Sequence, residues 1–128
     1  MATVFMAEDD PLMVSIYART FKANGFDLQM AMDGEQAIDS LKAMDQKPDV
    51  VILDIMMPKK DGFQVLQEMK QDDLLKHIPV ICLTNLSGPE NAQKAIGLGA
   101  NAYMVKSQHG PVEIVDKVKE IYGKMGKQ

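Results

Sequence analysis

Residues 49–62 read Asp49-Val50-Val51-Ile52-Leu53-Asp54-Ile55-Met56-Met57-Pro58-Lys59-Lys60-Asp61-Gly62. The four apolar residues before Asp54 have no amphipathic period, which is typical of a strand buried on both faces of a parallel sheet. A proline and an Asp-Gly pair follow and break regular structure, so the strand is expected to end at Asp54. Open α/β sheets bind ligands where their strands end. The stretch therefore predicts an α/β fold with a carboxylate, Asp54, at the ligand-binding end of the sheet.

Strand and helix signals alternate on both sides of this stretch. Asp10-Pro11 is typical of a helix start, and Asp33 with Gln36 three residues later predicts a capping box at another. The predicted strand-helix units span residues 3–25, 26–45, 49–72, 79–98 and 102–123. Five such units predict a (βα)5 doubly wound parallel sheet covered by helices on both faces. Residues 1–128 are expected to form a single domain.

The composition is that of an ordinary soluble globular protein. The chain has 128 residues, of which 46% are hydrophobic and 25% charged, and its formal net charge is −4. This acidic balance argues against direct binding of nucleic acid, which requires a basic patch. The sequence shows neither a long apolar run nor a signal peptide, so a cytoplasmic location without membrane contact is expected. A single cysteine, Cys82, excludes an internal disulfide and a multi-cysteine metal site.

Side chains capable of chemistry stand at the ends of four of the five expected strands. Glu8 and Asp9 follow the first strand, and Asp54 follows the third. Thr84 ends the fourth strand, and Lys106 follows the fifth. Because parallel strands end on the same side of their sheet, all five side chains are expected close to one another.

This set of side chains predicts phosphoryl chemistry assisted by a metal ion. Three clustered carboxylates repel one another and raise each other's pKa unless a cation joins them. Mg²⁺ is a hard cation that proteins hold with few carboxylates and several waters. With this ion, Lys106 and Thr84 could neutralise the oxygens of a transferring phosphoryl group. Asp54 would then be the nucleophile and would form an aspartyl phosphate.

The motifs around these residues resemble the receiver domain of two-component response regulators, and the resemblance covers nearly the whole chain. The matching pieces are Glu8-Asp9, Leu53-Asp54-x-x-Met57-Pro58-x-x-Asp61-Gly62, Leu83-Thr84 and Gly99-Ala100-x-x-Tyr103-x-x-Lys106. The resemblance implies a flavodoxin-like fold with strand order 2-1-3-4-5. It also implies a phosphorylation-activated signalling switch, which is not an enzyme beyond limited self-phosphorylation and self-dephosphorylation.

The resemblance implies a role for each residue at the strand ends. Asp54 would accept a phosphoryl group from the phosphohistidine of a sensor histidine kinase or a histidine phosphotransfer protein. Mg²⁺ would be held by the carboxylates of Asp9 and Asp54, and by Glu8 through water. The backbone carbonyl of Met56 would add an oxygen ligand, and Lys106 would pair with the phosphoryl oxygens.

The implied output of the switch is a changed surface. Thr84 would bond the phosphoryl group and move toward it, while Tyr103 would turn inward. The helix-strand-helix segment 88–122 would then present an altered surface to a downstream protein target or output domain. The sequence shows no output domain of its own, so a stand-alone regulator or the receiver of a longer protein is expected.

Four neighbours of the site depart from the residues usual in the family. Asn85 stands where a small residue is usual. Ser107 stands where a proline with a cis bond is usual, and a non-proline cis bond costs ~2.5–4 kcal/mol, which leaves the geometry of this loop open. Met56 and Leu86 are apolar where polar side chains of relatives help to position hydrolytic water, which predicts slow self-dephosphorylation.

Other classes of protein match the sequence less well. A phosphohydrolase of the haloacid dehalogenase type needs an acid two residues after its nucleophile, where this chain has Met56. A flavodoxin-like binding module needs a phosphate-cradling loop after its first strand, where three consecutive acids would repel phosphate. A degenerate receiver that acts as a phosphorylation-independent interaction module stays open because of Asn85 and Ser107.

Overall fold

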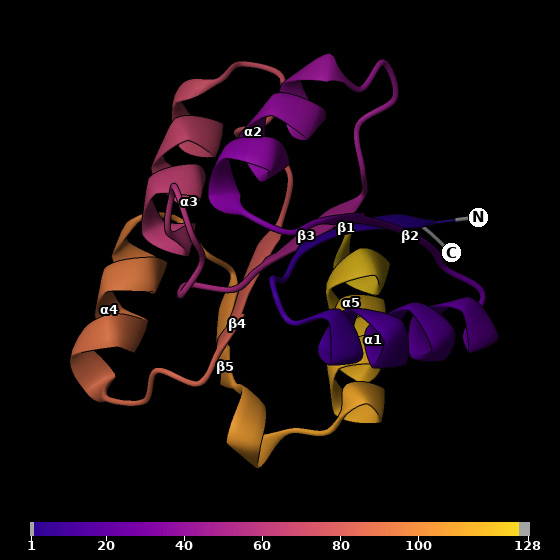
Figure 1. Cartoon of the computed structure of the whole chain (residues 1–128). Helices are drawn as coiled ribbons and strands as arrows, with labels where there is room; N and C mark the ends of the chain where they lie inside the picture. Colours follow the sequence, from indigo (N-terminus) through magenta and orange to yellow (C-terminus); the bar gives the residue numbers. More distant parts are fainter. Residues whose placement is uncertain (1, 126–128) are drawn as a thin grey trace.

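A central sheet of five parallel strands organises the computed structural model, which describes residues 2–125 (Figure 1). The strands are β1 (Thr3–Ala7), β2 (Asp27–Ala31), β3 (Val50–Leu53), β4 (Val80–Thr84) and β5 (Ala102–Val105). They lie in the order β2-β1-β3-β4-β5, and every neighbouring pair is parallel. This order confirms the predicted flavodoxin-like fold.

Helices cover both faces of the sheet, as expected for a doubly wound fold. They are α1 (Pro11–Ala23), α2 (Gly34–Ala43), α3 (Gly62–Gln71), α4 (Pro89–Gly97) and α5 (Pro111–Lys124), with a 3-10 turn η1 (Lys106–Gln108). Figure 1 shows α1 and α5 on one face of the sheet and α2, α3 and α4 on the other. All five predicted strand-helix units are therefore present, and α5 continues to Lys124, one residue beyond its expected unit.

Successive residues of the central strands belong to two different apolar cores. Val50 and Ile52 of β3 pack with residues of α1 and α5, whereas Val51 and Leu53 pack with residues of α2 and α3. All four side chains are buried, which confirms that this apolar run is covered on both faces. Cys82 of β4 lies in the second core, where burial raises the pKa of its thiol to about 12. At neutral pH this thiol stays protonated and behaves as a small core side chain.

Aspartates at their N-caps start α1 and α2. The Leu12 N–H donates a 3.0 Å hydrogen bond to Asp10 Oδ1, and the Gln36 N–H donates one of 2.7 Å to Asp33 Oδ1. The predicted capping box at Asp33 is incomplete, because the side chain of Gln36 accepts a hydrogen bond from the Met32 N–H at 2.8 Å instead of from Asp33. Helix α2 therefore starts at the predicted place, but only one of the two hydrogen bonds of a capping box forms.

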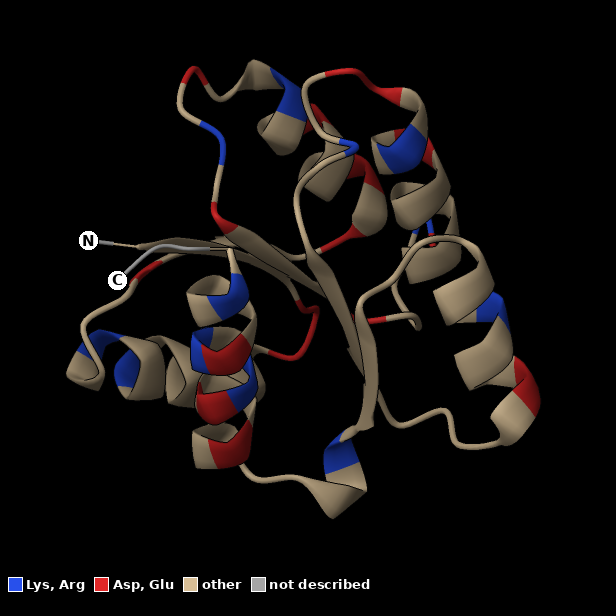
Figure 2. Ribbon diagram, turned by 180° about the vertical axis from the view of Figure 1, so that it is seen from behind, with Lys and Arg blue, Asp and Glu red and all other residues tan. Residues whose placement is uncertain are grey.

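Charged residues of both signs alternate along α5 (Figure 2). Glu120 pairs with Lys117 at 3.3 Å and with Lys124 at 3.2 Å, and of these three residues only Lys117 is half-buried. Such surface pairs add little to stability, because solvent screens them. Within residues 2–125, every helix is too short or too polar to span a lipid bilayer.

Candidate functional site

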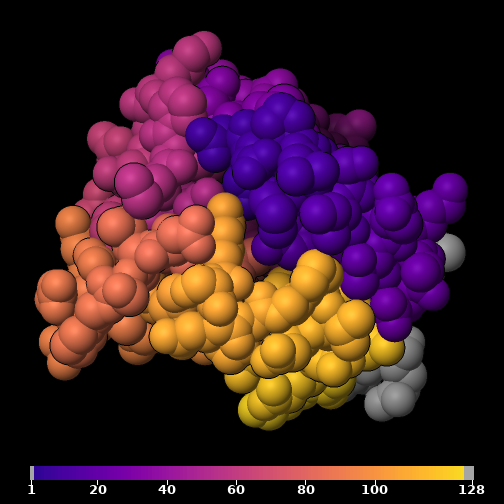
Figure 3. Space-filling model, turned by 60° about the horizontal axis from the view of Figure 1, so that its bottom comes forward, coloured from indigo at the N-terminus to yellow at the C-terminus, as the bar shows by residue number. Residues whose placement is uncertain are grey.

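The strand register brings the chemically active residues to one end of the sheet. Ala7 of β1 lies beside Leu53 of β3, so Glu8 and Asp54 follow adjacent strands at the same level. Thr84 at the end of β4 lies beside Val105 of β5, directly before Lys106. Figure 3 shows the molecule from below, where the indigo, magenta and orange segments of the chain converge. Residues from four strand ends therefore share one site.

A shallow cleft of about 200 Å³ at this end contains the predicted site residues. Its lining comprises Glu8, Asp9, Asp10, Asp54, Met56, Thr84, Asn85 and Lys106. Glu8, Asp54 and Thr84 are the buried polar or charged side chains of the described residues. Tyr103, which is expected to form the switch together with Thr84, does not line this cleft.

Three carboxylates form the acidic part of the site. One carboxylate oxygen each from Glu8, Asp9 and Asp54 lie within 4.8 Å of one another. Glu8 and Asp54 are buried, whereas Asp9 is exposed to solvent. A cation can therefore reach the group from the Asp9 side.

Lys106 bridges the two buried carboxylates. Its Nζ lies 2.5 Å from Glu8 Oε1 and 2.8 Å from Asp54 Oδ2. The side chains of all three residues are at most 12% exposed, so these ion pairs are shielded from solvent. The pairing of Lys106 with Glu8 is not among the sequence predictions, which gave this lysine only the phosphoryl oxygens.

Backbone amides hold the second oxygen of each buried carboxylate. The Asp10 N–H donates to Glu8 Oε2 at 3.1 Å, and the Met56 N–H donates to Asp54 Oδ1 at 3.1 Å. The carboxylate planes are thus fixed by one lysine and two amides, which is the preorganisation expected of a reactive site.

The charges of the site do not balance. Burial raises the pKa of Glu8 above its usual value, although the ion pair with Lys106 opposes this effect. Burial also tends to lower the pKa of Lys106, but its hydrogen bonds to Asp54 and Glu8 outweigh burial and raise it. Lys106 is therefore charged at neutral pH. Three carboxylates face one ammonium group, which leaves a surplus of two negative charges when all are ionised.

This donor set fits a hard divalent cation. Mg²⁺ prefers oxygen ligands, few carboxylates and several waters, and the exposed Asp9 leaves room for water. A divalent ion would also offset the surplus of negative charge. The residues present therefore fit the metal that the sequence predicted.

Thr84 and Tyr103 meet at the backbone of Leu86. The Leu86 N–H donates to Thr84 Oγ1 at 3.3 Å, and the Tyr103 hydroxyl donates to the Leu86 carbonyl oxygen at 2.6 Å. Burial raises the pKa of Tyr103, so its hydroxyl stays protonated as a donor at neutral pH. Leu86 is a link between these two residues that sequence reasoning missed, because its contribution comes from the backbone.

Asn85 and Ser107, which differ from the residues expected at these positions, do not block the acidic cleft. Asn85 is exposed and lines the rim of the acidic cleft, so it does not fill the cleft. Among the described residues no peptide bond is cis, so the bond between Lys106 and Ser107 is trans. Both residues belong to the 3-10 turn η1. Lys106 still reaches both carboxylates from this loop.

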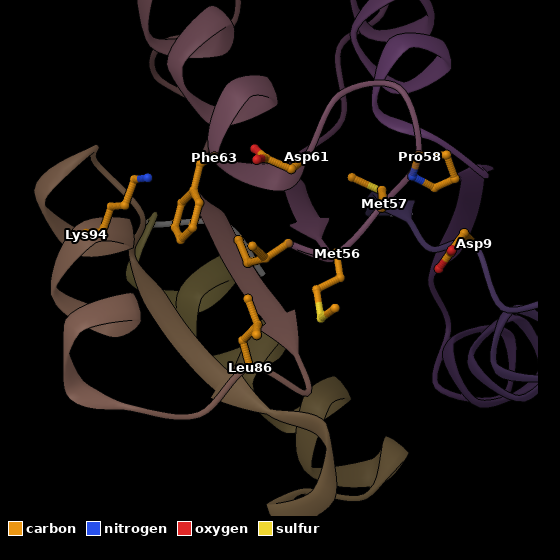
Figure 4. Close-up of a pocket in the computed structure, with 9 residues that line it drawn as sticks. Asp9, Met56, Met57, Pro58, Asp61, Phe63, Leu86 and Lys94 are labelled. Carbon is orange, nitrogen blue, oxygen red and sulfur yellow. The ribbon is translucent and has the colours of Figure 1, made fainter.

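A larger cleft of about 600 Å³, lined by apolar and charged side chains, adjoins the acidic site. Figure 4 shows Met56 and Leu86 projecting into it, with Phe63 and Lys94 at one end and Asp9 at the other. Lys94 Nζ lies 4.4 Å from the centre of the Phe63 ring. The acidic site is therefore bordered on this side by apolar side chains.

The fold and these side chains together define a flavodoxin-like α/β protein with an acidic, lysine-bridged site where its strands end. The sequence model of the response regulator receiver domain matches residues 4–119. The solved receiver domain of the Francisella response regulator 1452 is similar, with a TM-score of 0.88 and 27% identity, covering 98% of this chain and 99% of that chain.

Curated proteins give the same result. The alkaline phosphatase synthesis transcriptional regulatory protein PhoP of Bacillus subtilis is 34% identical over 120 residues, which are 92% of this chain and 47% of that protein. The polar-differentiation response regulator DivK of Brucella anthropi is 28% identical over 121 residues, which are 94% of this chain and 96% of that protein. The chain thus spans about half the length or less of relatives such as PhoP.

The chain belongs to the response regulator receiver domain family. Members of this family are phosphoacceptor switches of two-component systems, not conventional enzymes, and they interact with histidine kinases and downstream effectors. The acidic group of Glu8, Asp9 and Asp54 is compatible with Mg²⁺ and with aspartyl phosphorylation.

Proposed function

We propose that this chain is a switch in which Asp54 accepts a phosphoryl group from a phosphohistidine. The observation that carries the proposal is the buried Asp54 carboxylate, 2.8 Å from Lys106 and grouped with Glu8 and Asp9. In the transfer, an Asp54 oxygen bonds to phosphorus while the phosphorus–nitrogen bond of the phosphohistidine breaks. The leaving imidazole nitrogen keeps the electron pair of the broken bond.

The acidic group would hold Mg²⁺ during this transfer. Glu8, Asp9 and Asp54 would supply carboxylate oxygens, Glu8 through water, and Met56 would supply its backbone carbonyl. The bound ion would add positive charge against the phosphoryl oxygens as negative charge spreads over them. Support for this assignment comes from the surplus of negative charge on the three clustered carboxylates.

Lys106 and Thr84 would bind the transferred group. Lys106 already contacts the attacking carboxylate, so a short movement of its Nζ brings it to a phosphoryl oxygen. Thr84 is fully buried and its hydroxyl lies at the same end of the sheet, where it can donate to another phosphoryl oxygen. Both contacts strengthen as charge develops on the phosphoryl group.

Movement of Thr84 would change the surface that partners recognise. If the hydroxyl turns toward the phosphoryl group, it releases the Leu86 N–H and disturbs the loop to which Tyr103 bonds. The surface of α4, β5 and α5 would then change, and a downstream protein target or output domain would bind it differently. A sensor histidine kinase or a histidine phosphotransfer protein would be the donor.

The decisive test is Mg²⁺-dependent phosphoryl uptake from acetyl phosphate. The intact mass of the chain should rise by one phosphoryl group in Mg²⁺ and should not change in EDTA. Uptake of one phosphoryl group per chain, which base then removes, supports an acyl phosphate. Complete absence of uptake in Mg²⁺ would contradict the proposal and favour the other reading, a phosphorylation-independent interaction module.

The phosphorylated protein is expected to lose its phosphoryl group slowly, over minutes or longer. Met56, 58% exposed, and Leu86 border the site, and neither side chain can orient a water for attack on phosphorus. Met56→Asn keeps the backbone carbonyl and adds a hydrogen-bonding side chain, so it should shorten the half-life about threefold to tenfold. Intact mass measured at intervals after removal of acetyl phosphate gives the half-life.

A matched control for Met56→Asn is Leu74→Asn. Leu74 is 73% exposed in the turn that follows α3, so the same polar amide there should leave the half-life unchanged. A half-life of only seconds for the unaltered chain would show that apolar neighbours do not slow the reaction.

A further inference from the structure

Gly34, the first residue of α2, lies against the backbone of the loop that follows Asp54. A Cβ at position 34 would stand 1.9 Å from the carbonyl oxygen of Lys60 and 2.6 Å from its carbonyl carbon. The Gly34 N–H also donates a 3.4 Å hydrogen bond to the carbonyl oxygen of Pro58. Because the nearest of these contacts are backbone atoms, rotation of a side chain cannot make room for a larger residue.

The loop is fastened to both neighbouring helices. Lys60 Nζ pairs with Glu68 Oε2 of α3 at 2.7 Å, and Lys59 Nζ lies 3.8 Å from Asp33, the residue that caps α2. Lys59 has a φ of 70°, in the left-handed region that residues other than glycine rarely adopt. A left-handed lysine persists only where its surroundings hold the backbone in place.

The same loop carries one of the groups that hold the Asp54 carboxylate. Its first residues include Met56, whose N–H bonds to Asp54 Oδ1 at 3.1 Å. Its far end is closed by Gly62, whose N–H donates to the Ile55 carbonyl oxygen at 2.9 Å. A Cβ on Gly62 would stand 2.4 Å from the Asp54 carbonyl oxygen, so this end has no free space either. Both ends of the loop that contains Lys60 therefore lie in contact with Asp54 or with the residue that follows it.

We propose that Gly34 is a positioning residue for the site at Asp54. The missing side chain at the start of α2 lets the loop 55–61 approach closely, which sets the place of the Met56 carbonyl and of the Asp54 carboxylate. A methyl group at position 34 would have to move from 1.9 Å to at least 3.4 Å from the Lys60 oxygen to reach ordinary contact. The inference rests on the function proposed above, and it adds a determinant of metal affinity outside the strand ends.

Gly34→Ala tests this inference, with Gly97→Ala as its matched control. Both glycines lie within helices, but a Cβ at Gly97 meets nothing within 4 Å. Helix propensity alone predicts that alanine slightly stabilises either helix. Instead, Gly34→Ala should raise the dissociation constant for Mg²⁺ about tenfold, as loss of supporting contacts does at other metal sites. Gly97→Ala should leave it within about twofold of the original. Titration calorimetry below the unfolding temperature gives both values.

Two further readouts separate positioning from mere loss of fold. In EDTA, the amide resonances of Met56, Met57, Lys59 and Lys60 should shift in Gly34→Ala and not in Gly97→Ala. In the unaltered chain, the amide resonances of Gly34 and Met56 should shift with the same Mg²⁺ midpoint. This measurement can be made even if Gly34→Ala does not fold.

The outcomes distinguish this inference from the proposed function. An unchanged Mg²⁺ affinity in Gly34→Ala, or a Gly34 resonance that stays still at saturating Mg²⁺, would overturn the positioning role alone. Failure of the unaltered chain to bind Mg²⁺ would overturn both. Weaker Mg²⁺ binding by Gly34→Ala, together with normal binding by Gly97→Ala, supports the role.

Discussion

Asp54→Asn is expected to lower phosphoryl uptake from acetyl phosphate by at least about a thousandfold, because an amide oxygen is a poor nucleophile toward phosphorus. Asparagine has nearly the same shape as aspartate, so its side-chain oxygen can still accept the Met56 N–H that now bonds Asp54 Oδ1. The fold should therefore survive the change. Intact mass after incubation in Mg²⁺ measures the uptake, and circular dichroism reports the fold.

Asp116→Asn is the matched control for this experiment. Asp116 is exposed on α5, so the same loss of one carboxylate there should leave uptake unchanged. Full uptake by Asp54→Asn would place the phosphoryl group on another residue. Loss of uptake in both variants would point to an effect of net charge rather than to a nucleophile.

The sheet could be predicted because its signals are local. β3 and residues 80–83 of β4 are continuous apolar runs, and both strands are buried along their whole length. β2, at the edge of the sheet, alternates between exposed and covered residues before the buried Ala31. Five alternating strand-helix units and right-handed crossovers leave few possible arrangements. The order 2-1-3-4-5 itself follows from the resemblance to receiver domains and not from the periodicity.

The gathering of the site residues could also be predicted, because it depends on topology alone. Residues that follow parallel strands meet at one end of the sheet wherever their side chains point. How the side chains pair could not be predicted. Lys106 follows β5 and reaches Glu8, which follows β1, past the two strands that lie between them. No local pattern encodes the reach of one long side chain.

Contacts between segments that are distant in the sequence could not be predicted from local patterns for the same reason. Leu74 and Leu75 are adjacent in a turn with charged neighbours, yet Leu74 is 73% exposed and Leu75 is fully buried. The contact of Gly34 with Lys60 likewise depends on how α2 and the loop after β3 pack together. These contacts can be seen only in the three-dimensional structure, and they distinguish this chain from a generic α/β domain.

Lys106→Met is expected to lower the free energy of unfolding in EDTA by about 3 kcal/mol, because it leaves two buried carboxylates without their shared cation. Glu8 and the side chain of Asp54 are 2% and 7% exposed, so solvent cannot replace the ammonium group. Mg²⁺ should restore about 2 kcal/mol in this variant when present at well above its dissociation constant. Urea denaturation followed by circular dichroism, with EDTA and with Mg²⁺, measures both values.

The gain from Mg²⁺ should be larger in Lys106→Met than in the unaltered chain, because Lys106 and the metal ion offset the same negative charge. Lys22→Met is the control, since Lys22 is exposed at the end of α1 and its loss should change stability by less than about 0.5 kcal/mol in either condition. Equal gains from Mg²⁺ in Lys106→Met and in the unaltered chain would mean that lysine and metal act on separate charges. A larger increase in the free energy of unfolding of Lys106→Met would show that Mg²⁺ can partly replace the Lys106 ammonium group, which pairs with Glu8 and Asp54.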